Sequence, residues 1–247
     1  MLILEKKKMK IFIKNKFFFI NILICILLLF TTNCEYYLIP EKKILKNSLK
    51  HEYLKAVKIL VDKKYKKALI QFSNLYINYP YNMYTEKILV YLIYLNYLNK
   101  DFINVLELSE EFIESYDSSA FISYIFYIRI LSEISLDSNN LLQILFNINR
   151  NNCNPFYTKL AIHDTKIFIK NFPKSKYTNI LKKKLIKMRK RIQLFDLNII
   201  NFFLKKKNYT ATINRCLIFL KEYPNSVNTC FVKKILKYSY NEISLKK

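Results

Sequence analysis

From Leu49 onward, apolar residues return along the chain at the spacing of an α-helix. In residues 181–195 they fall at Leu181, Leu185, Met188, Ile192 and Phe195, in steps of four and three that place them on one helix face. The lysines and arginines between positions 182 and 191 mostly occupy the other faces. No segment alternates between apolar and polar residues as a half-buried strand does, so the pattern predicts an all-α protein.

A helical segment of about fifteen residues recurs in this pattern. It opens with an aromatic residue at Tyr65, Phe102 and Tyr209, which are 37 and 107 residues apart, the second interval being about three repeats of 36. Its inner face carries Ala68, Phe72 and Tyr76 in the first copy, Val105 and Leu106 in the second, and Thr212, Cys216 and Leu220 in the third. Prolines stand outside the periodic segments, where we expect helices to stop, at Pro80, Pro155, Pro173 and Pro224. The spacing predicts a solenoid of helix-turn-helix repeats of the tetratricopeptide (TPR) kind.

The turns inside these repeats lack glycine, because the chain contains none. Where such repeats usually have Gly-Asp or Gly-Asn, this chain has Lys63-Lys64, Lys100-Asp101 and Lys207-Asn208. A lysine in the left-handed conformation costs about 1 kcal/mol more than glycine, so we expect a less stable array than a consensus one.

The first 48 residues have the layout of an exported protein. Lysines dominate residues 1–16, the apolar run 17–30 follows, and Thr31-Thr32-Asn33-Cys34 comes next. This arrangement resembles a bacterial lipobox, so residues 1–33 are interpreted as a lipoprotein signal peptide and Cys34 as the lipidated mature N-terminus. The alternatives are an uncleaved signal anchor and a cysteine that stands there by chance. Residues 34–48, which contain Pro40, are interpreted as a tether.

Composition narrows the chemistry of the chain. Its 247 residues include 42 Lys+Arg and 18 Asp+Glu, for a formal net charge of +24. Without glycine, the dinucleotide and phosphate loops and the nucleophile elbow are absent, and two histidines leave little imidazole for a zinc or general-base site. We therefore expect no enzyme, no cofactor and no metal. Composition typical of an A+T-rich genome lowers the weight of the charge as evidence for nucleic-acid or anionic-lipid binding.

The cysteines after Cys34 form no CxxC pair. Cys153, Cys216 and Cys230 are an odd number, which excludes a full disulfide framework. A bridge between Cys216 and Cys230 stays possible in an oxidising compartment, although small buried thiols are the favoured interpretation.

Five segments in order and at family spacing carry a resemblance. They are Leu75–Tyr84 (LYINYPYNMY), Tyr127-Ile128-Arg129, Asn149–Pro155 (NRNNCNP), Asp164 with Phe172–Thr178 (FPKSKYT), and Asn214-Arg215 with Glu222-Tyr223-Pro224. Over more than 150 residues they resemble the BamD family, the outer-membrane lipoproteins of the β-barrel assembly (BAM) machinery. Asn82 stands where that family has glycine, and Cys153 where it has arginine.

The resemblance implies a fold, partners and a location. It implies about five TPR-like repeats, with N-terminal repeats in residues 49–136 that bind unfolded outer-membrane protein clients through their C-terminal signal. The C-terminal repeats, residues 137–247, would dock on a periplasmic POTRA domain of the barrel protein BamA. Arg215, with its neighbour Asn214, matches the family's docking surface. The protein is then expected on the periplasmic face of the outer membrane.

Several residues allow two interpretations. Tyr79, Tyr81, Tyr84 and Tyr94 are predicted either to line a client-peptide groove or to pack within the repeats. Arg129, embedded in an apolar stretch, must pair with a carboxylate or face solvent, and is a further candidate for that groove.

Three function classes remain. They are a BamD-like assembly scaffold, another periplasmic TPR adaptor that coordinates cell-envelope enzymes, and a nucleic-acid-binding repeat, against which lipidation of Cys34 argues. The basic run Lys182–Arg191 is interpreted as a solvated helix face, with binding of phosphates or lipid head groups as the alternative. His163-Asp164 with Cys153 resembles a catalytic set, which we reject because adjacent helical residues point about 100° apart.

Overall fold

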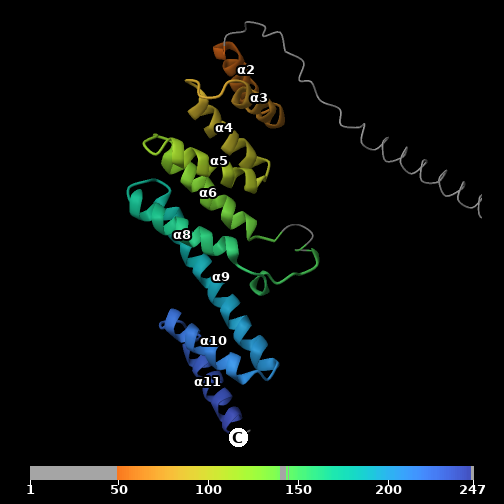
Figure 1. Cartoon of the computed structure of the whole chain (residues 1–247), viewed down its shortest axis with the longest axis vertical. Helices are drawn as coiled ribbons and strands as arrows, with labels where there is room; N and C mark the ends of the chain where they lie inside the picture. Colours follow the sequence, from red (N-terminus) through yellow and green to blue (C-terminus); the bar gives the residue numbers. More distant parts are fainter. Residues whose placement is uncertain (1–48, 140–142, 144, 246–247) are drawn as a thin grey trace, which may run out of the picture. The chain divides into compact units, whose positions relative to one another are not determined.

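The computed structural model describes residues 49–139, 143 and 145–245, and within them it contains α-helices, one 3-10 helix and no strand (Figure 1). The elements are α2 (Leu49–Val61), α3 (Tyr65–Asn78), α4 (Thr85–Leu98), α5 (Phe102–Ser115), α6 (Ile122–Leu136), η1 (Arg150–Asn152), α8 (Phe156–Asn171), α9 (Thr178–Lys205), α10 (Tyr209–Glu222) and α11 (Thr229–Ser244). The predicted all-α fold is confirmed for this part of the chain. The predicted signal peptide, Cys34 and the tether lie outside the described residues.

Each helix packs against the next one along the chain. Four helix pairs, α2/α3, α4/α5, α6/α8 and α9/α10, form successive repeats, and α11 begins a fifth. Contacts between α4 and α6 also join the first helices of neighbouring repeats. Residues Ser48–Lys247 form one compact unit, in which α6 and α8 pack across the predicted division at residue 136. The structure is therefore a TPR-like array, as predicted.

The turns inside three repeats have the backbone that the sequence predicts. Lys63, Lys100 and Lys207 adopt φ angles of 58°, 62° and 55°. The helix that follows each turn begins at the predicted aromatic residue. Asp101 and Asn208 also cap their helices, because their side chains accept the backbone N–H groups of Asn104 and Ala211. Lysine thus adopts the left-handed conformation in these turns, where such repeats usually have glycine.

The turns between repeats share a second pattern, which the sequence analysis did not find. An aromatic residue ends the second helix of each repeat: Tyr79, Tyr116, Phe172 and Tyr223. Three residues later stands Asn82, Ser119, Ser175 or Ser226, whose carbonyl accepts the N–H of the residue a further three positions on. Pro80, Pro173 and Pro224 lie just after these helix ends, but Pro155 instead precedes the start of α8.

The core confirms most of the predicted inner face. Ala68, Val105 and Thr212 are fully buried, and so are Phe72 and Cys216. Tyr76, Leu106 and Leu220, which were expected on the same face, are only half-buried. Four phenylalanines occupy the centres of the helix pairs: Phe72, Phe112, Phe168 and Phe219. Small side chains let the paired helices approach, and the phenylalanines fill the space beside them.

The cysteines differ in their surroundings. Cys153, Cys216 and Cys230 are all free thiols. Only Cys216 is buried, and burial raises its pKa to about 11. Cys230 is exposed, so the expectation of small buried thiols is wrong for that residue.

Among the described helices, none is both long and apolar enough to cross a membrane.

Candidate functional site

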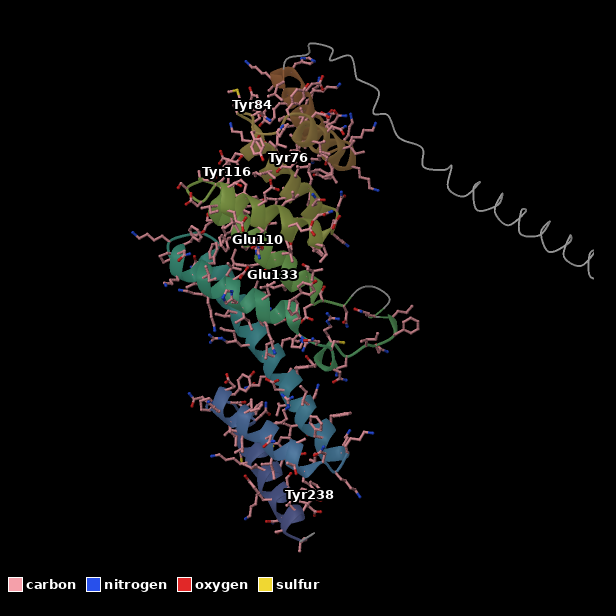
Figure 2. The ribbon with its side chains drawn as sticks, viewed as in Figure 1. Tyr76, Tyr84, Glu110, Tyr116, Glu133 and Tyr238 are labelled. Atoms are coloured by element: carbon pink, nitrogen blue, oxygen red, sulfur yellow. The ribbon has the colours of Figure 1, made fainter. Side chains whose placement is uncertain are left out.

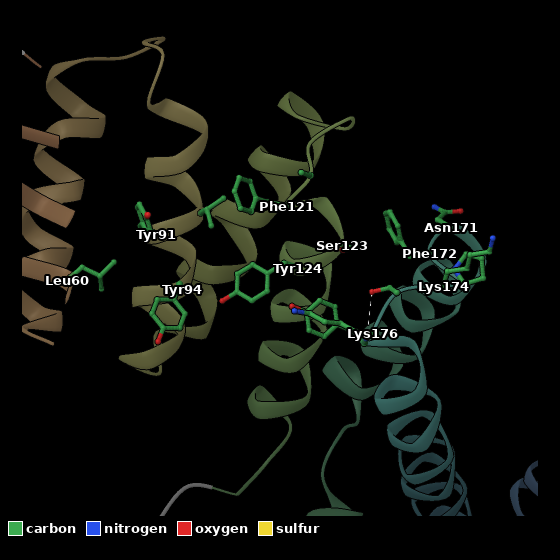
Figure 3. A pocket seen from close by; sticks show the side chains of 15 residues that line it. Leu60, Tyr91, Tyr94, Phe121, Ser123, Tyr124, Asn171, Phe172, Lys174 and Lys176 are labelled. Atoms are coloured by element: carbon green, nitrogen blue, oxygen red, sulfur yellow. Dashed lines mark hydrogen bonds between the residues drawn. The ribbon is translucent and has the colours of Figure 1, made fainter. Parts of the chain in front are cut away.

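One hollow among the described helices is an aromatic groove between α4, the start of α6 and the turn from α8 to α9. It encloses about 930 Å³. Figure 3 shows Leu60 and Tyr91 at one end and Asn171 and Lys174 at the other. Its lining also includes Val90, Tyr94, Ala120, Phe121, Ser123, Tyr124, Phe172, Pro173, Ser175, Lys176 and Tyr177. Aromatic rings and two lysines thus face a common hollow.

One wall of the groove, formed by the turn from α8 to α9, is held by contacts within the chain. The Thr178 hydroxyl donates to the Phe172 carbonyl over 2.7 Å, and Thr178 N–H donates to the Ser175 carbonyl over 3.1 Å, so the α8–α9 turn is closed on itself. The Tyr177 ring stacks on Tyr127 of α6 with centroids 4.2 Å apart. This turn therefore presents Lys174 and Lys176 from a fixed backbone.

The chemistry of the groove suits an apolar peptide with a negative charge. Burial, followed by the surrounding tyrosines, raises the pKa of Tyr124 to about 12, so its hydroxyl stays neutral and can donate a hydrogen bond. Aromatic walls accept large apolar side chains. The ammonium groups of Lys174 and Lys176 attract an anion such as a terminal carboxylate.

The predicted groove tyrosines lie in different surroundings. Only Tyr94 lines the aromatic groove. Tyr84 stacks on Tyr53 with centroids 4.3 Å apart, and Tyr79 packs against the core of the first two repeats. Tyr81 is 99% exposed and has a φ of 55°, so the left-handed residue of this turn precedes Asn82, the position where the resemblance places a glycine. The structure brings Tyr79 and Tyr84 to the repeat core, and their role in client binding stays a prediction.

Arg129 finds carboxylates, as its apolar setting requires. Its guanidinium lies 2.7 Å from Glu110 of α5, 3.0 Å from Asp164 of α8 and 3.5 Å from Glu133 of α6. Figure 2 labels Glu110 and Glu133 on neighbouring helices. Burial, and then the Asp164 carboxylate, raise the pKa of the fully buried Glu133 to about 9, so Glu133 is neutral at pH 7. Arg129 therefore joins three helices and is not among the residues that line the aromatic groove.

A second hollow, of about 710 Å³, lies between the C-terminal part of α9, α10 and the η1 segment. We call it the Arg215 groove. Its lining is Asn152, Phe195, Asn198, Ile199, Asn201, Phe202, Phe203, Lys205 and Arg215. Arg215 and Asn214 are both exposed, but Asn214 is not part of the lining. An exposed arginine and the exposed ring of Phe202 line the same hollow, and both residue types are enriched at protein interfaces.

Asp137 fixes the segment that carries η1. Its buried carboxylate accepts Arg150 over 2.8 Å and lies 3.5 Å from Arg191 of α9. The Thr158 hydroxyl donates to the same carboxylate. Arg191 in turn donates to the Cys153 carbonyl over 3.0 Å. Sequence analysis missed Asp137, since a buried acid at a helix end carries no periodic signal.

The rejected His163-Asp164 pair does make contact. His163 Nδ1 lies 3.1 Å from Asp164 Oδ1, so the expectation that these side chains point apart is wrong. Asp164 is also held by Arg129, so its role in the structure is ionic pairing between helices. Within the part of the chain that the structure describes, no group of three His, Cys, Asp or Glu side chains could hold a metal ion.

Helix pairs stacked in this way, with hollows between them, are typical of helical-repeat proteins that bind other proteins. Residues 46–247 match the family described as YfiO: Outer membrane lipoprotein. The chain belongs to this family of outer membrane lipoproteins, in agreement with the resemblance seen in its motifs.

Relatives that are similar in sequence carry the name outer membrane protein assembly factor BamD. The chain is 37% identical over 142 residues to that of Buchnera aphidicola subsp. Acyrthosiphon pisum, which covers 58% of this chain and 57% of the relative. It is 27% identical over 167 residues to that of Pasteurella multocida, covering 68% and 64%, and 28% identical over 167 residues to that of Vibrio cholerae, covering 68% and 69%. The chain therefore matches less than two thirds of the length of the first two relatives.

Proposed function

We propose that this protein is an assembly scaffold of the outer membrane, which binds unfolded barrel proteins and a BamA-like partner and catalyses no reaction. The observation that carries the proposal is the pair of separate hollows on one TPR-like array, in a chain whose relatives are named outer membrane protein assembly factors. Affinity purification of the tagged chain from membranes tests it. Co-recovery of a barrel protein with POTRA domains is expected, and recovery of cell-wall enzymes instead would favour the alternative periplasmic adaptor.

The aromatic groove is the proposed client site. An extended segment with bulky apolar side chains fits between α4 and α6, with its terminal carboxylate toward Lys174 and Lys176. Client peptides end at a free carboxylate, which internal segments of folded proteins lack. The basic end of the groove thus provides selectivity for chain ends.

Tyr94→Ala is expected to weaken binding of a peptide copied from the C-terminus of an outer-membrane barrel protein by about tenfold, because an aromatic side chain is lost from the lining of the groove. Fluorescence anisotropy of the labelled peptide measures the affinity. Tyr81→Ala is the matched control, since Tyr81 is exposed and outside the lining. Equal losses at both positions would support the broader tyrosine set predicted from sequence, and no loss at Tyr94 would remove the peptide from this groove.

The Arg215 groove is the proposed dock for the BamA-like partner. We expect Arg215→Glu to weaken that complex by a hundredfold or more, because reversing an interfacial charge replaces attraction with repulsion. Arg215 is exposed, so the thermal midpoint should stay nearly unchanged. Surface plasmon resonance and thermal unfolding of the same variant separate the two effects. Unchanged affinity would exclude Arg215 from the interface, and a collapsed midpoint would assign it to the fold.

Cys34 is the proposed lipid anchor at the periplasmic face of the outer membrane. We expect the mature chain to begin at Cys34 with a covalent lipid, and the Cys34→Ser variant to leave the membrane fraction when the membranes are washed in molar salt, which screens purely electrostatic contacts. Mass spectrometry of the N-terminal peptide measures this directly. An unmodified chain that still begins at Met1 or Met9 would contradict the anchor and favour an uncleaved signal segment.

A further inference from the structure

Charge is distributed unevenly over the described helices. Residues 49–136 contain ten basic and ten acidic side chains. Residues 156–195, which cover α8 and the first part of α9, contain twelve basic side chains and a single acid, Asp164. A bias in genome composition that adds lysine without regard to position would raise the number of basic side chains in both regions. The concentration on α8 and α9 therefore points to an anionic partner.

One exposed face of α9 gathers this charge around an aliphatic residue. Ile186 lies in the first part of α9 and is 71% exposed. The residues three and four positions to either side of it are Lys182, Lys183, Arg189 and Lys190. With Lys187 they form what we call the α9 basic surface, and all of these side chains are exposed.

The opposite face of α9 is buried in the core, so the α9 basic surface faces solvent. Leu181 and Met188 are buried in the cluster that includes Phe168 of α8 and Ile130 of α6. Among residues 49–139, 143 and 145–245, no carboxylate forms an ion pair with any cation of the α9 basic surface. Its charge is therefore not neutralised within the fold.

An exposed aliphatic side chain among cations suits a lipid surface better than other polyanions. At a membrane, the apolar side chain enters the head-group region while lysine stems extend their ammonium groups toward phosphates. A nucleic-acid surface would be expected to provide aromatic side chains for base stacking, and this face has none. Membership of an outer membrane lipoprotein family also places the chain beside lipid.

We propose that the α9 basic surface binds the anionic head groups of a phospholipid membrane, with Ile186 inserted between them. This contact is distinct from the client groove and from the Arg215 groove, and it does not depend on a lipid at Cys34. It would hold the array against the membrane instead of leaving it free at the end of a tether.

The chain contains no tryptophan, so one introduced indole reports on its own position. Ile186→Trp in the full chain is mixed with phosphatidylcholine vesicles that contain or lack phosphatidylglycerol, and the emission maximum is recorded. Ile77→Trp is the matched control, because Ile77 is 73% exposed on α3, in the electrically neutral region. We expect a blue shift for Ile186→Trp with the anionic vesicles only, and none for Ile77→Trp.

Charge reversal then tests the cations. Each lysine near an anionic surface contributes about fivefold to affinity, so Lys182→Glu, Lys183→Glu and Lys187→Glu together should weaken binding by a hundredfold or more. The control is a second triple variant, Lys58→Glu, Lys66→Glu and Lys67→Glu on α2 and α3. It has the same change in net charge and should leave the indole shift unchanged. Molar salt should abolish the shift, because it shortens the screening length to about 3 Å.

A lipid on Cys34 would tether every variant to both kinds of vesicle, so the readout is the difference between the two indole positions. Equal shifts at 186 and 77, or equal shifts on neutral and anionic vesicles, would overturn the proposal. So would a response of Ile186→Trp to a DNA oligonucleotide or an acidic protein but not to vesicles. None of these results depends on client or partner binding, so the proposed function can fail or stand separately.

Discussion

The Arg129→Met variant is expected to lose about 3–5 kcal/mol of unfolding free energy at pH 7, measured by urea denaturation of the full chain. Methionine keeps much of the packing volume but leaves Asp164, a nearly buried carboxylate, without its guanidinium. The cost arises from that uncompensated charge, not from the net value of the ion pairs. Because Arg129 joins α5, α6 and α8, the loss should fall on the contact between the second and third repeats.

Two controls separate charge from size. Arg215→Met makes the same substitution at an exposed site and should change stability by about half a kcal/mol or less. Glu133→Gln should be tolerated, because Glu133 is already neutral at pH 7. If Arg129→Met lowers the unfolding free energy no more than Arg215→Met does, the ion pairs of Arg129 contribute nothing to folding.

The raised pKa of Glu133 also sets the sign of a pH effect. Its pKa is 4.5 in the reference state and about 9 in the folded chain, so unfolding between these values releases a proton. This residue therefore contributes its full stability below pH 4.5 and loses it as the pH rises toward 9. Glu133→Gln should remove that loss, and its stability advantage over the parent should grow between pH 5 and pH 8.

The Asp137→Asn variant is expected to lose a similar 3–5 kcal/mol and to free the η1 segment. Asparagine has nearly the same shape, but it leaves Arg150 and Arg191 without the charge that joins them. Hydrogen exchange should show faster exchange in residues 145–155, while α2 to α5 keep their protection. The effect should reach the Arg215 groove, because Asn152 lines it and Asn198 donates to Asn152 Oδ1 over 2.8 Å.

Asp62→Asn is the matched control for this substitution. Asp62 pairs with Lys64 over 3.3 Å at the surface, and such pairs contribute less than about 1 kcal/mol. A small loss at Asp62 together with a large one at Asp137 would confirm that burial decides the effect. Equal small losses, with unchanged exchange in residues 145–155, would show that the segment is held by its other contacts.

The candidate sites were only partly predictable from sequence. Tyr94 and Arg215 were singled out and do line the two hollows. Tyr124, Tyr177, Lys174 and Lys176 were not named as site residues, because the groove is assembled from segments about thirty to fifty residues apart, and no local pattern records which turns meet. The sequence nevertheless marks the turns between repeats, because an aromatic residue ends the second helix of each repeat. Phe172 is one of these residues, and it lines the groove.

By itself the sequence determined the helical repeat, its starts and its left-handed turns, because these depend on spacing, on caps and on the backbone of single residues such as Lys100. The tertiary structure alone decided which charges meet. The apolar stretch around Arg129 indicates that this residue needs a carboxylate or solvent. Its partners Glu110 and Asp164, however, lie 19 and 35 residues away along the chain. Ion pairing depends on distances of a few ångströms between helices, and only packing sets those distances.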